Sequence, residues 1–302
     1  MHNIPVIDFS LFTSNDAIAR HTVVKQIYLA CHEIGFIYLQ NYGIPQNLIQ
    51  QIFMQSQYLF NLPLQIKQSL AWSDEFSNTG YVDRERERLN PQRPGDLKEA
   101  FNVSKDSISS SKFPANTEFR TCILAFYEAC TELALKVLQT FALALELPED
   151  FFATNHNQQN HTLRLLHYPP LSEPPLPKQI RAGEHSDYGS ITLLFQDEVG
   201  GLEVQTATGE WIAAPTIPGT VIVNTGDLME RWTNHVFCST KHRVMIPNHD
   251  KVKQSRYSVA FFCHPNDDTE IACLESCQRE KPPIYSSILA REYLLSRLQA
   301  TY

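Results

Sequence analysis

Two histidines and one aspartate carry the clearest chemical potential in the chain. His185 and Asp187 belong to the segment GEHSD, which directly precedes an apolar run over residues 190–195. In an extended segment, residues two apart point to the same side, so an imidazole and a carboxylate should converge. His242, on a distant predicted strand, could supply a third ligand. Two histidines and one carboxylate with the opposite face open favour a mononuclear non-haem Fe(II) site.

The H-x-D spacing alone is close to chance, and two other interpretations of these residues are open. His185 could be an ordinary turn residue, with Asp187 capping the turn. His235 lies seven residues before His242 and follows Asn234 in a predicted loop, so it is only a fallback ligand.

A second pair of residues lies fourteen positions after His242. Arg256 and Ser258 are two apart in an otherwise apolar strand pattern, so they share one face of the strand. A guanidinium in such a setting needs an anion, and its fork geometry suits a carboxylate. The pair therefore predicts a site for a carboxylate near the metal.

Composition narrows the function classes. The 302 residues are 43% hydrophobic, carry a net charge of −8 and contain no long Lys/Arg run, so nucleic acid is not an expected partner. The N-terminus lacks the pattern of a secretory signal, and no apolar run approaches the ~18 residues of a membrane span. The seven cysteines are scattered and do not form a disulfide framework. We expect a cytoplasmic protein that does not enter a membrane.

The elements that must position these residues follow from hydrophobic periodicity. Apolar residues at helical spacing predict helices over 17–34, 46–60, 64–70, 117–147 and 284–298. Short β-type runs follow residue 160, at 163–168, 190–195, 202–205, 211–213, 220–224, 242–246 and 257–263, after early strands at 4–9 and 36–39. The polar stretch 73–112 is predicted to be irregular. Seven or eight short strands separated by turn signals favour a sandwich or jelly roll.

The substrate side is less marked in the sequence. We name Tyr81, Phe101, Phe262 and His264 as candidate substrate residues, although simple core packing is nearly as good an interpretation for the two phenylalanines. The charged segment 84–94 could form a lid. Its alternating RERER pattern favours a solvated surface instead.

The full set of motifs resembles the 2-oxoglutarate/Fe(II)-dependent dioxygenases. H-x-D, then a histidine about fifty residues on, then R-x-S is similar to that superfamily, and in particular to the branch of isopenicillin N synthase and the plant soluble dioxygenases. The likeness covers nearly the whole chain. It includes IPVID at 4–8, GF at 35–36, NYG at 41–43, KEAF at 98–101, RLLHYPP at 164–170, Gly226-Asp227 and Asn234.

The resemblance implies a role for each matching residue. His185, Asp187 and His242 would be the metal ligands and the catalytic centre. Arg256 and Ser258 would hold the distal carboxylate of 2-oxoglutarate, and Tyr168 would donate to the same co-substrate. Leu166 departs from the family, which has an asparagine there. The way in which the family orients the co-substrate therefore does not carry over directly to this position.

The resemblance also implies a fold and a domain organisation. The fold class is mixed α and β, a double-stranded β-helix (jelly-roll) core with flanking helices. The expected regions are an N-terminal dioxygenase region at 1–115, a long scaffold helix and connection at 116–160, the jelly-roll catalytic core at 161–266 and a C-terminal helix at 267–302.

The implied activity is oxidation of a small-molecule metabolite, with hydroxylation as the expected outcome and 2-oxoglutarate decarboxylated to succinate and CO2. The implied cofactors are Fe(II), 2-oxoglutarate and O2, with ascorbate as a stimulating reductant. We also expect a monomer, because the apolar stripe of the predicted helix 284–298 should pack on its own domain. Three alternatives stay open: an oxidase of the isopenicillin N synthase type, an ethylene-forming variant, and a non-enzymatic metal-binding jelly roll. The sequence leaves the substrate itself undetermined.

Overall fold

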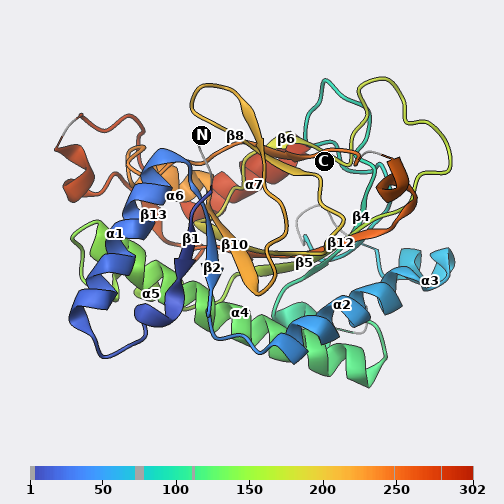
Figure 1. Ribbon diagram of the computed structural model, residues 1–302, viewed down its shortest axis with the longest axis horizontal. Coiled ribbons are helices and arrows are strands. Elements are labelled where there is room, and N and C mark those ends of the chain that lie inside the picture. The colour runs from blue at the N-terminus through green and yellow to red at the C-terminus, as the bar shows by residue number, and fades with distance from the viewer. Residues whose placement is uncertain (1–3, 72–77, 111–112, 248, 280, 302) are drawn as a thin grey trace.

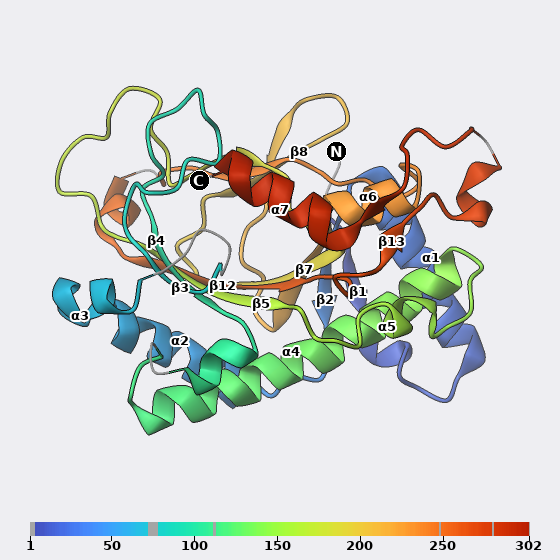
Figure 2. The ribbon, with the colours of Figure 1, turned by 180° about the vertical axis from the view of Figure 1, so that it is seen from behind.

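The fold is described by a computed structural model covering residues 4–71, 78–110, 113–247, 249–279 and 281–301. One large sheet and one small sheet lie at the centre, and the longest helix runs along the outer face of the large sheet (Figures 1 and 2). This is the double-stranded β-helix arrangement with flanking helices, and the predicted fold class is confirmed.

The large sheet has eight strands in the order β1-β2-β10-β7-β12-β5-β4-β3. Their bounds are β1 Val6–Asp8, β2 Phe36–Gln40, β3 Gly80–Val82, β4 Glu99–Val103, β5 Thr162–Tyr168, β7 Ile191–Gln196, β10 Thr220–Thr225 and β12 Arg256–Cys263. All pairs are antiparallel except β1 with β2. Strands from the N-terminal region therefore extend the sheet of the catalytic core at both edges.

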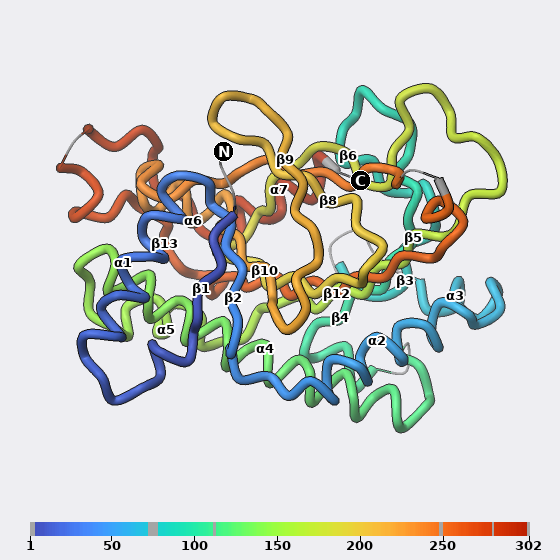
Figure 3. Tube along the Cα trace, in the orientation of Figure 1, coloured from blue at the N-terminus to red at the C-terminus, as the bar shows by residue number. Residues whose placement is uncertain are grey.

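The small sheet has four strands in the order β6-β11-β8-β9, with bounds β6 Ala182–His185, β11 His242–Val244, β8 Leu202–Gln205 and β9 Trp211–Ala213. A separate hairpin-like pair joins β13 Glu270–Ile271 to β14 Ile288–Leu289. The tube in Figure 3 shows β8 and β9 crossing over the large sheet.

The helices are α1 Ala17–Glu33, α2 Gln46–Phe60, α3 Leu64–Ser69, α4 Thr117–Ala144, α5 Phe151–Thr154, α6 Asp227–Trp232 and α7 Ala290–Thr301, with short 3-10 turns η1 Phe9–Leu11, η2 Asp106–Ser109, η3 His249–Lys253 and η4 Glu275–Gln278. Asp16 caps α1 and Asn116 caps α4 by accepting from the first backbone N–H groups. The buried face of α4, including Phe126 and Phe141, packs with α1, α2 and the large sheet to form the main core. In the part of the chain that is described, no helix is long and apolar enough to cross a membrane.

Three sequence predictions need correction. The C-terminal helix begins at Ala290, because residues 288–289 pair as β14 instead of continuing a helix from residue 284. The long helix ends at Ala144, and the left-handed backbone of Glu146 (φ +60°) turns the chain away before Pro148. The third correction concerns the polar stretch 73–112, of which residues 73–77 and 111–112 lie outside the described residues.

That stretch contains β3 and β4, which the sequence did not predict. Strand β4 is buried along its whole length, and its polar residue Glu99 accepts hydrogen bonds from Lys67, Tyr81 and His167. Because distant partners satisfy it, the strand lacks the alternating pattern that would reveal it from the sequence.

Candidate metal centre

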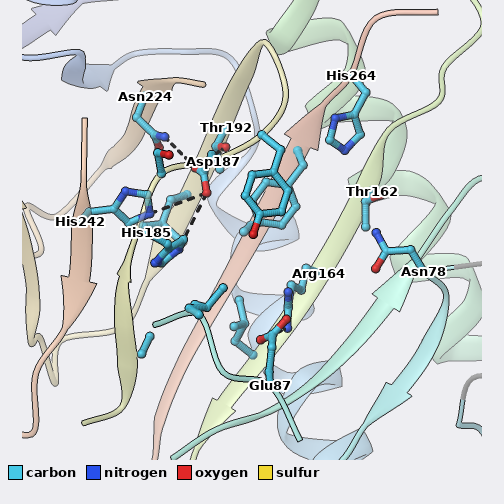
Figure 4. Close-up of a pocket in the computed structure, with 18 of the residues that line it drawn as sticks. Asn78, Glu87, Thr162, Arg164, His185, Asp187, Thr192, Asn224, His242 and His264 are labelled. Carbon is cyan, nitrogen blue, oxygen red and sulfur yellow. Dashed lines mark hydrogen bonds and ion pairs between the residues drawn. The ribbon is translucent and has the colours of Figure 1, made fainter. Parts of the chain in front are cut away.

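His185, Asp187 and His242 meet at one end of the small sheet. His185 is at the end of β6 and lies directly opposite His242 in the antiparallel pairing of β6 with β11. Their ring centroids are 4.3 Å apart. One ligand atom from each of the three residues lies within 4.8 Å of the others, and Figure 4 shows them converging on one point.

Neighbouring groups aim each of these ligand atoms. His185 Nδ1 lies 2.8 Å from the carbonyl of Gly183 and His242 Nδ1 lies 3.2 Å from that of Thr240, so Nδ1–H donates and Nε2 is left unprotonated. The Nε2 atoms lie 4.0 Å and 3.7 Å from Asp187 Oδ1.

The aspartate is held by its other oxygen. Asp187 Oδ2 accepts from Thr192 Oγ1 at 2.6 Å and from Asn224 Nδ2 at 2.7 Å. These two bonds occupy Oδ2 and leave Oδ1 turned toward the histidines. The donor set is therefore two unprotonated imidazole nitrogens and one carboxylate oxygen, which suits Fe(II).

The protonation states agree with this geometry. Burial, reinforced by the neighbouring His242, lowers the pKa of His185 to about 3, so this ring is neutral near pH 7. Burial raises the pKa of Asp187, but the two histidines and the hydrogen bonds from Asn224 and Thr192 outweigh it, and its pKa is lowered. A neutral imidazole and an ionised carboxylate are the forms that bind metal.

Arg256 and Ser258, both on β12, line the same cavity as the triad. Arg256 is 1% exposed, its guanidinium lies 4.7 Å from the centre of the Tyr168 ring, and its Nη2 donates to Gln196 Oε1 at 3.1 Å. Its Nε has no hydrogen-bond partner, and none of the described carboxylates forms an ion pair with it. A buried guanidinium in this condition fits an incoming carboxylate.

The cavity between these groups has a volume of about 460 Å³. Phe262 and His264 line it, as does Leu166. Burial lowers the pKa of His264 to about 4, and its Nδ1 has no hydrogen-bond partner among the described residues. These two candidate substrate residues therefore line the same cavity as the triad.

The other two candidates, Tyr81 and Phe101, are corrected. They are opposite each other in the pairing of β3 with β4, are each 1% exposed, and pack in the main core instead of lining the cavity. Tyr81 donates to Glu99, and Phe101 contacts Phe113 and Phe119.

The segment 84–94 is also not simply a solvated surface, although Arg84, Glu85, Arg86 and Arg88 are exposed. Glu87 is buried and lines the cavity. Arg93 pairs with Glu184, the residue before His185, and Asn90 donates to the same carboxylate at 2.9 Å. The segment therefore contacts the strand that carries His185.

Several cavity residues escaped the sequence analysis. Arg164 shares a strand face with Leu166 and Tyr168 at a spacing of two, and that spacing alone could have placed it at the site. Asn78 and the leucines of α7 carry no such signal, because only the tertiary fold brings them there. Further lining residues that were not predicted include Thr162, Tyr188, Thr192, Asn224, Leu294, Leu295 and Leu298.

His235 and His167 lie away from the centre. His235, the fallback ligand, contacts the Tyr285 hydroxyl at 2.7 Å and Glu230 at 3.4 Å, outside the cavity. His167 contacts Glu99 at 2.7 Å on the face of β5 opposite Tyr168, as its alternation with Tyr168 predicts.

Comparisons with known proteins agree with the architecture. Residues 157–265 match the 2OG-Fe(II) oxygenase superfamily, and residues 4–121 match the N-terminal region described as "non-haem dioxygenase in morphine synthesis". The chain is 33% identical to a proline hydroxylase of Petromyces alliaceus, with 98% of each chain covered, and 30% identical to a 2-oxoglutarate-dependent dioxygenase of Aspergillus rugulosus, with 99% of each covered. A crystal structure of a Neurospora crassa protein in complex with alpha-KG and thymine has 35% identity, a TM-score of 0.91, and coverage of 99% of this chain and 97% of that one.

Proposed function

The chain belongs to the 2OG-Fe(II) oxygenase superfamily, and on this basis we propose a role for each residue of the site. It is a 2-oxoglutarate-dependent oxidoreductase that uses iron and oxidises a small molecule. We propose that His185, Asp187 and His242 hold the Fe(II). The observation that carries this assignment is the convergence of two unprotonated imidazole nitrogens and one carboxylate oxygen at the wall of a cavity.

We propose that Arg256 receives the distal carboxylate of 2-oxoglutarate, with Ser258 and Tyr168 beside it. Ser258 Oγ lies 3.3 Å from Arg256 Nη1, so one carboxylate can contact both groups. Leu166 lines the cavity on the same strand face as Tyr168 and offers only apolar contact where the family has an asparagine. Arg256, Ser258 and Tyr168 therefore supply the polar contacts at this end.

Iron bound at the triad supplies the chemistry that couples decarboxylation of 2-oxoglutarate by O2 to oxidation of a substrate C–H bond. The protein positions the three candidate ligands. Asn224 and Thr192 keep Asp187 in one orientation, and the backbone carbonyls of Gly183 and Thr240 keep each imidazole in one tautomer. Leu294, Leu295 and Leu298 of α7 add apolar side chains to the lining of the cavity.

We propose that the substrate lies beside His264, Arg164 and Asn78, which are opposite the triad in Figure 4, and beside Phe262, which lines the same cavity. We propose hydroxylation as the outcome. A volume of about 460 Å³ shared with the co-substrate leaves room for a compact, ring-sized molecule. The Neurospora crassa neighbour holds thymine together with alpha-KG, and a compound of that size supports the same proposal.

The test of this function measures how much succinate and hydroxylated product form for each O2 consumed. Purified protein with Fe(II), 2-oxoglutarate and a substrate library should release about one succinate per O2 and per hydroxylated product. O2 uptake with product but no succinate would favour an oxidase of the isopenicillin N synthase type. Ethylene in the headspace would identify fragmentation of 2-oxoglutarate itself. Tight zinc with no O2 uptake would favour a non-enzymatic role.

Stimulation by ascorbate, the monomeric state, the cytoplasmic location and the four-part division at 1–115, 116–160, 161–266 and 267–302 stay predictions from the sequence.

A further inference from the structure

We propose that His264 is a specificity-determining residue, which donates a hydrogen bond from its Nε2–H to the edge of a flat ring in the substrate. The substrate class is a planar ring with a hydrogen-bond acceptor, such as a ring carbonyl oxygen, at that edge. This assignment rests on the proposed function, because it assumes that the substrate lies on the side of the cavity opposite the triad.

The backbone of His264 is anchored behind the cavity. His264 directly follows β12, and its backbone N–H donates to Nδ1 of His161 at 3.2 Å. His161 is itself only 1% exposed. The side chain of His264 lines the cavity on the side opposite the triad (Figure 4). The imidazole therefore reaches the cavity from a backbone position that the buried His161 holds.

The Nδ1 edge of the His264 ring faces the loop that follows Asp187. A Cβ atom on Gly189 would lie 2.7 Å from His264 Nδ1 and 2.7 Å from the carbonyl oxygen of Cys263, so this position suits only glycine. Nδ1 is buried and has no hydrogen-bond partner among the described residues, and the Cys263 carbonyl already accepts from the N–H of Ser190 at 2.9 Å. The loop therefore closes the Nδ1 edge and leaves Nε2 as the ring nitrogen available to the cavity.

The closed edge also determines which nitrogen of His264 carries the proton. Burial lowers the pKa of His264 to about 4, so the ring is neutral near pH 7 and holds one N–H. A proton on Nδ1 would be a buried N–H without an acceptor, which is rarer in folded proteins than a buried acceptor without a donor. The proton therefore belongs on Nε2, and His264 offers the cavity a hydrogen-bond donor.

The ring of Phe262 relates this donor to the plane of a flat ligand. The ring centroids of Phe262 and His264 are 6.4 Å apart, and the two planes differ by 16°. A ligand ring stacked parallel to Phe262 would therefore also be nearly parallel to the imidazole. The Nε2–H bond lies in the imidazole plane and so runs along the plane of such a ring. Its partner is then an acceptor at the edge of the ligand ring, not the face of that ring.

The same contacts relate the substrate to a metal ligand. Gly189, against which the His264 ring lies, is two residues beyond Asp187. Thr192, which donates to Asp187 Oδ2, is directly opposite Phe262 in the pairing of β7 with β12. A ring held by Phe262 and His264 is thus placed relative to the short segment that carries Asp187. His264 therefore selects rings with an acceptor and orients them relative to the metal centre.

The first measurement needs only the co-substrate. Protein labelled with 15N-histidine and loaded with Zn(II) and 2-oxoglutarate gives 15N–1H correlations of the histidine rings, and the signals that disappear in His264→Gln belong to His264. We expect a proton on Nε2 and none on Nδ1. A His264 ring with its proton on Nδ1 would overturn the proposal, because Nε2 would then be an acceptor.

The second measurement compares the binding of two flat rings by calorimetry on the same loaded protein. N-methyl-2-pyridone offers a carbonyl acceptor and no N–H, whereas aniline offers mainly N–H donors. Wild-type protein should bind the pyridone more tightly, and His264→Leu should lower the ratio of pyridone to aniline affinity by about 3- to 10-fold. His264→Gln should keep most of the wild-type ratio, because the glutamine amide can place an N–H near the position of Nε2.

His235→Leu is the matched control, since it makes the same change at a histidine that contacts Tyr285 outside the cavity, and it should keep the wild-type ratio. The proposal would be wrong if His264→Leu kept the ratio, if His264→Gln lost it as fully as His264→Leu, or if wild-type protein bound neither ring. Failure of the proposed function has a separate signature: the Zn(II)-loaded protein would not bind 2-oxoglutarate, before any ring compound is added.

Discussion

His185 and His242 are direct cross-strand partners, one at the end of β6 and the other at the start of β11, with ring centroids 4.3 Å apart. The antiparallel pairing therefore brings together two histidines that are 57 positions apart in the sequence. Asp187 lies two residues beyond His185 and completes the set. The centre is built on a paired backbone with fixed register, and this register brings the three candidate ligand atoms together.

Removing a hydrogen bond to Asp187 should weaken the metal site without dismantling it. Asn224→Ala deletes the donor at 2.7 Å from Asp187 Oδ2 and leaves Thr192 as its remaining side-chain donor. We expect Fe(II) affinity to fall by about 10- to 100-fold, measured by anaerobic titration. Thr220→Val, on the same strand but bonded only to the Ile217 carbonyl, is the control. Equal affinities in the two variants would show that Asn224 does not orient the ligand.

Arg256 should determine how tightly 2-oxoglutarate binds and which 2-oxo acid the protein accepts as co-substrate. Arg256→Met removes a buried guanidinium that has no ion-pair partner among the described side chains. Loss of a buried charge partner costs about 2–5 kcal/mol, so the KM for 2-oxoglutarate should rise by roughly 30-fold or more.

Fe(II) affinity should be unchanged in this variant, and the preference for 2-oxoglutarate over pyruvate, which lacks the distal carboxylate, should be lost. Ser258→Ala should show a smaller rise in KM. A variant that still discriminates against pyruvate would mean that the distal carboxylate is held elsewhere.

The ion pair between Glu184 and Arg93 should make stability depend on pH. The hydrogen bond from Arg93 is the main reason that the pKa of Glu184 is lowered, to about 2, from an ordinary value of 4.5. A lowered folded-state pKa stabilises the protein above the unfolded value, and the contribution is lost as the pH falls through the folded value.

Wild-type protein should therefore exceed Glu184→Gln in free energy of unfolding at about pH 7, by on the order of 1–2 kcal/mol after solvent screening. The difference should close as the pH falls from about 4.5 toward 2. Urea unfolding over this range measures it. Glu146→Gln, from a fully exposed pair with Arg279, should show a much smaller difference. If the difference in free energy of unfolding did not change with pH, the proposed contribution of the Glu184–Arg93 ion pair would be contradicted.

The sequence predicted the parts of the site that local spacing encodes. Period-two alternation placed His185 with Asp187 and Arg256 with Ser258, and the resemblance joined them to His242 and Tyr168. The same alternation applies to Arg164, Leu166 and Tyr168. The ion pair of Arg164 with the buried Glu87 appears only in the structure, because Glu87 is distant in the sequence.

The predictions that the structure corrects share one physical cause. Glu87 sits in an alternating charged run typical of a protein surface. It is nevertheless buried and paired with Lys98, just before β4, and with Arg164 on β5. Tyr81 and Phe101 pair across β3 and β4 but face the helices, and the direction in which a strand faces follows from sheet order. Local patterns do not carry such long-range partners.

The most direct test of the account compares Asp187→Ala with wild-type protein for bound iron and succinate formed in the same preparation. Wild-type protein should bind about one Fe(II) per chain and release succinate from 2-oxoglutarate, whereas Asp187→Ala should bind little iron and release none. Asp150→Ala, at an exposed position before α5, should behave as wild type. Succinate formation at an undiminished rate by Asp187→Ala would contradict the assignment of the iron ligands.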